Sequence, residues 1–178
     1  MERIGVFLSS NSDIDPAYVE AALRLGQWIG QQGKTLVYGG NAMGLMEQLA
    51  QSVRKNGGHV VGVIPQGAEY GHMHVSDAVD TAFYCANMAD RKQTLLQESD
   101  ILVALPGGIG TLDEVLSVVA AATVGEHTKR VLLYNVGHCW DSFLHLLDDL
   151  RRQKLIYRPT EDFLQEVSDF AQLTEILR

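Results

Sequence analysis

The sequence predicts an α/β protein with an open, mostly parallel sheet and helices on both faces, a Rossmann-like three-layer arrangement. Short apolar runs typical of buried strands alternate along the chain with longer amphipathic runs typical of helices. In addition, glycine-rich or polar turns repeatedly follow a strand and precede a helix. Right-handed crossovers place all such turns at the carboxyl ends of the strands, where open parallel sheets bind ligands. We therefore expect a binding site at that rim.

Length and composition are those of an ordinary globular domain. The 178 residues, of which 46% are hydrophobic and 20% charged, predict a single nucleotide-binding domain over residues 1–178. The net charge of -8 disfavours a nucleic acid or an anionic membrane as partner. Because we see neither a leader segment nor an apolar run of membrane-spanning length, we expect the cytoplasm. Cys85 and Cys139 lack zinc-site spacing, so we expect no metal.

Local signals mark the elements of the first half. Asp15 as N-cap and Pro16 at the first helical position begin a helix, which Gly33 ends. Residues 66–80 lack periodicity and predict a long surface loop of the kind that is often functional or mobile. We expect strands at 4–8, 35–38 and 59–64, helices at 16–32 and 45–55, and polar turns at 9–12 and 39–44.

The second half repeats the pattern. A helix over residues 87–99 places Met88, Arg91 and Lys92 along one side, next to the expected rim. The remaining expected elements are strands at 81–85, 101–105, 130–134 and 163–167, helices at 112–124 and 141–154, and a terminal helix.

Residues 105–114, Leu-Pro-Gly-Gly-Ile-Gly-Thr-Leu-Asp-Glu, are the centre of the predicted site. They join a buried strand to a helix through glycines, so free backbone N–H groups at the helix start can approach an anion. The first turn, residues 9–12, lacks the G-x-G-x-x-G pattern of a dinucleotide site, and no G-x-x-x-x-G-K-[ST] loop occurs for a triphosphate. A monophosphate fits this turn better.

Two interpretations of Glu114 remain open from the sequence. Thr111 and Glu114 match a capping box, which needs no catalysis. A carboxylate beside a phosphate-binding turn is also useful for catalysis, and a capping box does not require the neighbouring glycines. We expect Asp113 to complement the helix N-terminus. Arg91 stays protonated, so it can orient Glu114 or hold a phosphate or sugar oxygen but cannot donate a proton.

Two histidine positions receive structural interpretations. His72 and His74 look like a metal pair, but no carboxylate or cysteine cluster accompanies them, so we favour a surface loop. His127 lies near the end of the helix over 112–124, where a cationic side chain is favoured for structural reasons.

Two motifs together resemble those of the LONELY GUY (LOG) phosphoribohydrolases, also labelled "lysine decarboxylase-like". Residues 105–114 match PGGxGTxxE, and residues 88–92 match MxxRK. The resemblance implies hydrolysis of the N-glycosidic bond of cytokinin riboside 5'-monophosphates or AMP, without a cofactor, by a homodimer with its site near the subunit interface. It implies catalytic roles for Glu114 and Arg91. It also implies a substrate-binding set: Gly107, Gly108, Gly110, Thr111, Lys92, Met88, Ser9, Ser10, Gly39 and Gly40.

The implied chemistry agrees with the residues. Breaking a ribosyl C–N bond develops positive charge on the sugar. A carboxylate such as Glu114 can stabilise that charge or activate the attacking water. Asn41, where the family has a third glycine, and Leu8, where its first turn has glycine, depart from the pattern. A pyridoxal-dependent decarboxylase needs a Schiff-base lysine and a carboxylate for the pyridine nitrogen. It is disfavoured, because Lys92 is the only lysine near the rim and is adjacent to Arg91 on a helix.

Two alternatives from other classes share the predicted fold. A carrier that binds a nucleotide or cofactor without turnover needs only the glycine turn. An interaction module would use Glu114 only as a cap. The presence of both Arg91 and Glu114 favours the enzyme.

Overall fold

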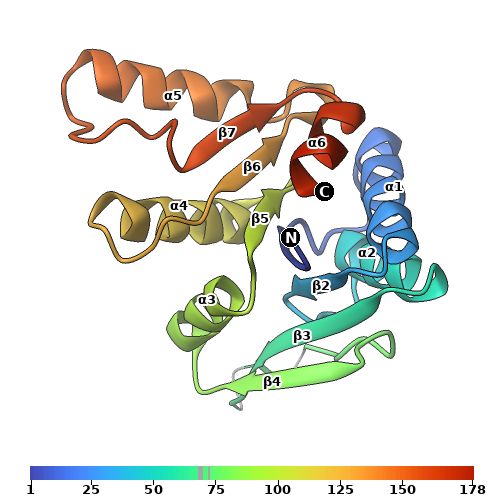
Figure 1. The fold of residues 1–178 in the computed structure, drawn as a ribbon. Helices are drawn as coiled ribbons and strands as arrows, with labels where there is room; N and C mark the ends of the chain where they lie inside the picture. The colour runs from blue at the N-terminus through green and yellow to red at the C-terminus, as the bar shows by residue number, and fades with distance from the viewer. Residues whose placement is uncertain (68–69, 72) are drawn as a thin grey trace.

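The computed structural model describes residues 1–67, 70–71 and 73–178 of the chain (Figure 1). The strands are β1 (Arg3–Phe7), β2 (Thr35–Tyr38), β3 (His59–Pro65), β4 (Thr81–Cys85), β5 (Ile101–Ala104), β6 (Val131–Tyr134) and β7 (Leu164–Val167). The α-helices are α1 (Pro16–Gln31), α2 (Gly44–Lys55), α3 (Met88–Gln97), α4 (Ile109–Thr123), α5 (Asp141–Arg152) and α6 (Phe170–Leu177). A short 3-10 helix, η2 (Val136–His138), follows β6.

The strands form one seven-stranded sheet in the order β4-β3-β2-β1-β5-β6-β7. Each of the six neighbouring pairs is parallel. The predicted α/β fold with an open parallel sheet is confirmed. The strand order reverses between β1 and β5, whose register pairs Ile4 with Ile101 and Phe7 with Ala104. In such sheets the ligand crevice lies at this reversal, beyond the carboxyl ends of the two strands.

Helices cover both faces of the sheet. Figure 1 shows α1, α2 and α6 on one face and α3, α4 and α5 on the other. Side chains on the two faces of a central strand belong to two separate buried clusters. In β1, Ile4 and Val6 belong to the cluster under α1 and α2, whereas Phe7 belongs to the cluster under α3 and α4. Strands buried on both faces read as continuous apolar runs, which is why the sequence signal was strong.

The expected elements are confirmed to within a few residues, with one shift that matters for the site. Helix α4 begins at Ile109, three residues before the predicted start at residue 112. Gly108 is its N-cap residue. Glycine is a poor helix former, so the glycines before Thr111 predict a turn, but this preference is too weak to keep glycine out of the first turn of a helix. The turn over η2 was not predicted.

The described part of the 66–80 loop is tied to the turn between β2 and α2. Asn41 and Val75 form an isolated antiparallel bridge. The Ala42 N–H donates to the His74 carbonyl at 2.8 Å, and the Ser76 N–H donates to the Gly40 carbonyl at 3.0 Å. The rim of the sheet therefore includes this segment. His72 lies outside the described residues. Within the described ranges, no helix has both the length and the apolarity needed to cross a membrane.

Candidate active site

A cavity of about 660 Å³ opens at the reversal of strand order. Its wall brings together turns that follow β1, β2 and β5 with the start of α3. Most of the predicted site residues line it, namely Ser9, Ser10, Gly39, Met88, Arg91, Gly108, Gly110, Thr111 and Glu114. We call it the glycine-lined cavity.

The N-terminus of α4 faces this cavity with room for a ligand. Gly108 and Gly110 line the cavity, and a Cβ added at either position would meet no atom within 4 Å. Neither glycine has a left-handed backbone conformation. Packing and backbone geometry therefore do not require glycine at these positions, whereas a ligand resting on the first-turn N–H groups would.

The turn after β1 closes the other side of the same opening. The Ser9 N–H donates to the Pro106 carbonyl at 3.2 Å, which joins the two turns across the reversal. Ser9 Oγ accepts from the Asn11 N–H at 3.0 Å, and Asn11 Oδ1 accepts from the Asp13 N–H at 3.1 Å. These local bonds hold the small side chains of the turn on the cavity wall.

Arg91 and Glu114 form a nearly buried ion pair at the base of the cavity. Arg91 Nη1 lies 3.2 Å from Glu114 Oε1, and the two side chains are 6% and 12% exposed. The Arg91 Nε–H also donates to the Val63 carbonyl at 2.9 Å, so β3 fixes the guanidinium. A Cβ at Gly39 would lie 1.8 Å from Arg91 Nη2, so only glycine leaves space for this arrangement.

Burial perturbs the acid–base behaviour of Glu114. Desolvation raises the pKa of this carboxyl to about 7, although the Arg91 guanidinium acts to lower it. A group whose pKa is close to neutrality exists in both protonation states at working pH. Such a carboxyl, in a cavity and beside a fixed cation, is a candidate for acid–base or charge-stabilising chemistry.

The capping-box interpretation of Glu114 is wrong for this structure. Because Gly108 is the N-cap, Thr111 is the third residue of α4 and Glu114 the sixth, too far along to cap the helix. Asp113 does not complement the helix N-terminus either, since it lies beyond the first turn. Its carboxylate accepts from Lys92 Nζ at 2.8 and 2.9 Å.

Three predicted site residues lie outside this wall. Lys92 is turned toward Asp113 and a second cavity. Gly107 packs against Thr111, whose Oγ1 would be 2.0 Å from an added Cβ. Gly40 has a φ of 74° and faces Ile64, so it shapes the turn without reaching the wall.

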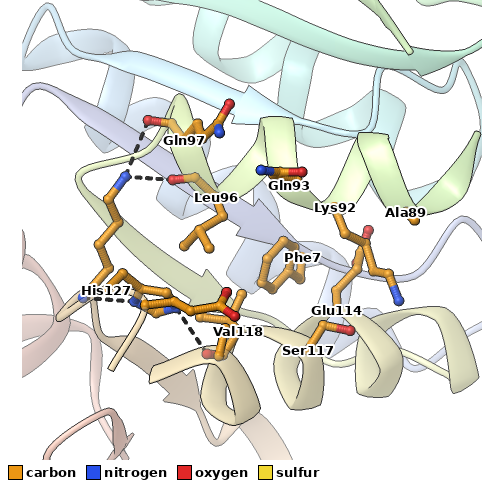
Figure 2. Close-up of a pocket in the computed structure, with 13 residues that line it drawn as sticks. Phe7, Ala89, Lys92, Gln93, Leu96, Gln97, Glu114, Ser117, Val118 and His127 are labelled. Atoms are coloured by element: carbon orange, nitrogen blue, oxygen red, sulfur yellow. Dashed lines mark hydrogen bonds between the residues drawn. The ribbon is translucent and has the colours of Figure 1, made fainter. Parts of the chain in front are cut away.

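The second cavity, of about 420 Å³, lies between α3 and α4 (Figure 2). Figure 2 shows Phe7 between the two helices, with Lys92 and Glu114 at one end and His127 at the other. Glu114 lines both cavities. His127 Nδ1 accepts a hydrogen bond from the Lys129 N–H at 3.1 Å, and Nε2 lies 3.0 Å from the Val118 carbonyl oxygen. The ring therefore joins α4 to the segment that follows it, which agrees with a structural role for His127.

The wall of the glycine-lined cavity also includes residues that were not among the predicted site residues. They come from the turn before α2, from α2 itself, from the 66–80 loop and from the start of α4. The added members include Asn41, Met43, Met46, Met73 and Ile109. Methionines at non-periodic positions attract no attention in a sequence. Asn41 was noticed only because it departs from the family pattern.

Comparison with known proteins gives a consistent result. The family model described as "Possible lysine decarboxylase" matches residues 46–177. A rice (Oryza sativa subsp. japonica) protein named "Probable cytokinin riboside 5'-monophosphate phosphoribohydrolase" is 41% identical over 82% of this chain and 64% of its own length. The chain thus spans slightly less than two thirds of that relative. An Arabidopsis thaliana cytokinin riboside 5'-monophosphate phosphoribohydrolase is 32% identical over 98% of this chain and 82% of its own.

Solved structures share the fold over nearly the whole chain. A molybdenum cofactor binding protein from Rippkaea orientalis is 26% identical with a TM-score of 0.72, covering 99% of this chain and 94% of that one. A Moco carrier protein from Chlamydomonas reinhardtii is 24% identical with a TM-score of 0.73 and the same coverage. The three-layer fold therefore supports different ligands in different proteins.

Proposed function

This chain belongs to the LOG family of cytokinin riboside 5'-monophosphate phosphoribohydrolases, and from that premise we propose that it hydrolyses the N-glycosidic bond of a purine riboside 5'-monophosphate. The substrate is an N6-modified, cytokinin-type adenosine monophosphate or AMP, and the products are the free base and ribose 5-phosphate. The observation that carries the proposal is the buried Arg91–Glu114 pair in the same cavity as the glycine-lined N-terminus of α4.

The phosphate is assigned to the N-terminus of α4. The N–H groups of Ile109, Gly110 and Thr111 belong to the first helical turn and have no earlier carbonyl within the helix to accept them. The helix dipole adds a positive potential at the same point. Ser9 and Ser10, on the turn after β1, are the hydroxyl donors to the same group. Binding of a phosphate there positions the ribose over Glu114.

In the proposed reaction, a water molecule attacks the anomeric carbon of the ribose, and Glu114 assists that attack. The C–N bond breaks with its electron pair going to the base, and the sugar develops positive charge. The Glu114 carboxylate stabilises that charge or accepts a proton from the attacking water. Arg91 remains protonated and holds Glu114 in place through the 3.2 Å contact, so it transfers no proton. We accordingly assign Glu114 and Arg91 as the catalytic pair.

The name of the family model does not describe this site. A pyridoxal-dependent decarboxylase forms a Schiff base with a lysine, which must reach the cofactor as a free amine. Lys92 instead donates to both carboxylate oxygens of Asp113, so its amine is already engaged with a partner in the protein. A hydrolase that needs no cofactor agrees better with these side chains.

The alternative is a carrier that binds a nucleotide or cofactor without cleaving it. Several solved structures of this fold are such carriers. A carrier gains nothing from burying Arg91 and Glu114 together, because burial of an ion pair carries a desolvation penalty that binding alone does not require. The ion pair therefore favours the enzyme.

One experiment separates the two functions. The purified protein is incubated with AMP and with N6-isopentenyl-AMP, and free base and ribose 5-phosphate are measured by chromatography. We expect turnover of both nucleotides and none of adenosine, since adenosine lacks the phosphate that α4 holds. A nucleotide that binds in calorimetry but stays intact over hours supports the carrier and contradicts the hydrolase.

We also propose a homodimer with the site close to the subunit interface. Helix α4 leaves three large apolar side chains strongly exposed, Ile109 at 82%, Leu116 at 46% and Val124 at 72%. A second copy of the chain is the partner that the family resemblance implies, and it would cover this row. Light scattering after size exclusion tests the assembly, and Leu116→Glu should shift it to monomers.

The remaining proposals concern the domain and the compartment. We propose that residues 1–178 form a single nucleotide-binding domain, supported by the one sheet that contains all the described strands. The cytoplasm agrees with two free thiols, Cys85 and Cys139, because reducing compartments keep cysteines unpaired.

A further inference from the structure

The turn between β2 and α2 presents to the glycine-lined cavity a carboxamide that the fold itself does not use. Asn41 is 9% exposed and lines the cavity. Among the residues that the structure describes, none donates a hydrogen bond to its Oδ1. Buried side-chain oxygens are normally paired, so an unpaired one on a cavity wall is complementary to a donor on a ligand.

Structural reasons for asparagine at this position do not apply. Within the described residues, left-handed non-glycine backbones occur at His138 and Lys154, so Asn41 is not placed to adopt that conformation. Its backbone is already paired with Val75. The N-cap of α2 is Met43, so Asn41 does not cap the helix. The carboxamide is thus free to serve a ligand.

Methionines line the same cavity as this carboxamide. Four of the five methionines in the chain line the cavity, Met43, Met46, Met73 and Met88. Met46 Cε would lie 2.5 Å from a Cβ at Gly39, the same glycine that Arg91 contacts, so the methionine wall adjoins the catalytic pair. Unbranched thioethers adapt to irregular apolar groups and make favourable contacts with aromatic rings.

The combination of one carboxamide and several thioethers fits a purine with an amino group at C6. A carboxamide presents an acceptor and a donor side by side, which pair with the N6–H donor and the N7 acceptor of adenine. A 6-oxo purine presents two acceptors along that edge, so one of them would face Oδ1. An N6-alkylated adenine keeps one N6–H, and its alkyl group can rest on the thioethers.

We propose that Asn41 determines base specificity by accepting a hydrogen bond from the 6-amino group and donating one to N7, while Met43, Met46 and Met73 pack against the ring and its N6 substituent. The inference rests on the proposed function, since it takes the phosphate to lie at the N-terminus of α4. Asn11, the other carboxamide on the wall, already accepts from the Asp13 N–H, so it is not equally available.

The test measures binding separately from turnover. Dissociation constants for AMP and for inosine 5'-monophosphate are determined by calorimetry in the Glu114→Gln background, which prevents hydrolysis during titration. We expect AMP to bind about 10- to 100-fold more tightly, the usual worth of a two-point contact to a base. Asn41→Leu, which keeps the branched shape and the number of side-chain heavy atoms but removes both hydrogen-bonding groups, should bring the two constants to within about threefold of each other.

Two further variants complete the design. Ser10→Ala, at the phosphate-binding turn, should weaken both nucleotides in parallel and leave their ratio unchanged. Asn41→Gly removes the side chain without adding bulk. It tests the role of Asn41 if thermal melting shows that the leucine variant is not folded. Equal binding of the two nucleotides by the parent, or an unchanged ratio in the folded Asn41 variants, overturns the assignment.

Cleavage of the nucleotides is measured separately from the effect of Asn41 on their binding. If the chain with Glu114 intact discriminates the two nucleotides through Asn41 but cleaves neither, the hydrolase proposal fails and the base assignment stands. If both nucleotides are cleaved but Asn41 has no effect on their ratio, the reverse holds. Failure of AMP to bind the Glu114→Gln protein overturns the base assignment as well.

Discussion

The two cavities that share Glu114 differ in how the fold makes them. The glycine-lined cavity is built by turns at the carboxyl ends of β1, β2 and β5, where backbone N–H groups point outward and the helix dipole is positive. The cavity between α3 and α4 is a gap between two helix sides, lined by groups such as Phe7 and Val118. Its polar groups at the far end serve helix ends, since Lys129 donates to the Leu96 carbonyl at 2.6 Å. The orientation of the backbone donors therefore distinguishes the candidate site from the gap between the helices.

The largest expected effect is at Glu114, the residue that lines both cavities, and a control variant then tells which cavity carries the chemistry. Glu114→Gln should lower kcat for AMP at least about 100-fold, the usual contribution of a group that moves a proton or stabilises charge. Gln93→Ala, which lines the cavity between α3 and α4 but not the glycine-lined cavity, is the matched control and should change kcat less than twofold. Comparable losses in both variants would place the chemistry in the gap between the helices.

The second prediction separates ligand space from packing at the glycines. A methyl group at Gly110 meets no protein atom within 4 Å and lies in a helix, so Gly110→Ala should raise stability by about 0.5–1 kcal/mol. The same methyl group occupies space assigned to the phosphate and should raise KM about tenfold, roughly 1.4 kcal/mol of binding. Thermal melting and steady-state kinetics measure the two effects.

Gly39 contrasts with Gly110, because an added methyl group at Gly39 meets protein atoms. Gly39→Ala would bring a carbon to 1.8 Å from Arg91 Nη2, so both stability and activity should fall. A Gly110→Ala protein that melts at a lower temperature, with KM unchanged, would contradict the assignment of the phosphate to α4.

The third prediction uses the pKa of Glu114. Burial raises it to about 7, so the carboxylate forms as pH rises through that value. If the ionised form is the active one, kcat should rise about tenfold between pH 6 and pH 8, because the ionised fraction rises in that proportion. Asp113 also acts to raise this pKa, so Asp113→Asn should move the midpoint of the profile to lower pH. A profile that falls with pH would assign Glu114 as an acid.

The same shift has a stability consequence. The folded protein holds a proton on Glu114 over a pH range in which the unfolded chain has lost it. The contribution of Glu114 to the free energy of unfolding should therefore decrease as pH rises from about 4.5 to about 7. Denaturant unfolding of Glu114→Gln, which lacks the titrating group, should show a smaller decrease over that range.

The smallest expected effect concerns the methionine wall. Met43 is half exposed, so Met43→Gln should be tolerated by the fold. Loss of an apolar contact should lower the ratio of kcat/KM for N6-isopentenyl-AMP to that for AMP by about threefold to tenfold. Leu155→Gln, at an exposed apolar side chain that does not line the cavity, is the control. An unchanged ratio would separate the methionines from the N6 substituent.

The sequence alone determined the strand–turn–helix order, the parallel sheet and the family. These depend on local features, namely periodicity, glycines at turns and the two motifs around Arg91 and Glu114, which a single chain displays directly. The predicted start of α4 is wrong because glycine at 108 and 110 is typical of a turn, whereas the helix begins at Ile109. The capping interpretation of Glu114 depended on that misplaced start.

Only the tertiary structure decided which side chains meet. Glu114 pairs with Arg91 from 23 positions earlier, Lys92 is held by Asp113, and Asn41 is brought to the cavity wall beside methionines from separate segments. Such contacts depend on the strand order and on the packing of α3 against α4. They connect residues far apart in the chain, and no local pattern specifies which of several polar partners a buried group will find. The burial that raises the pKa of Glu114 likewise belongs to the assembled core, because desolvation depends on everything that surrounds the carboxyl.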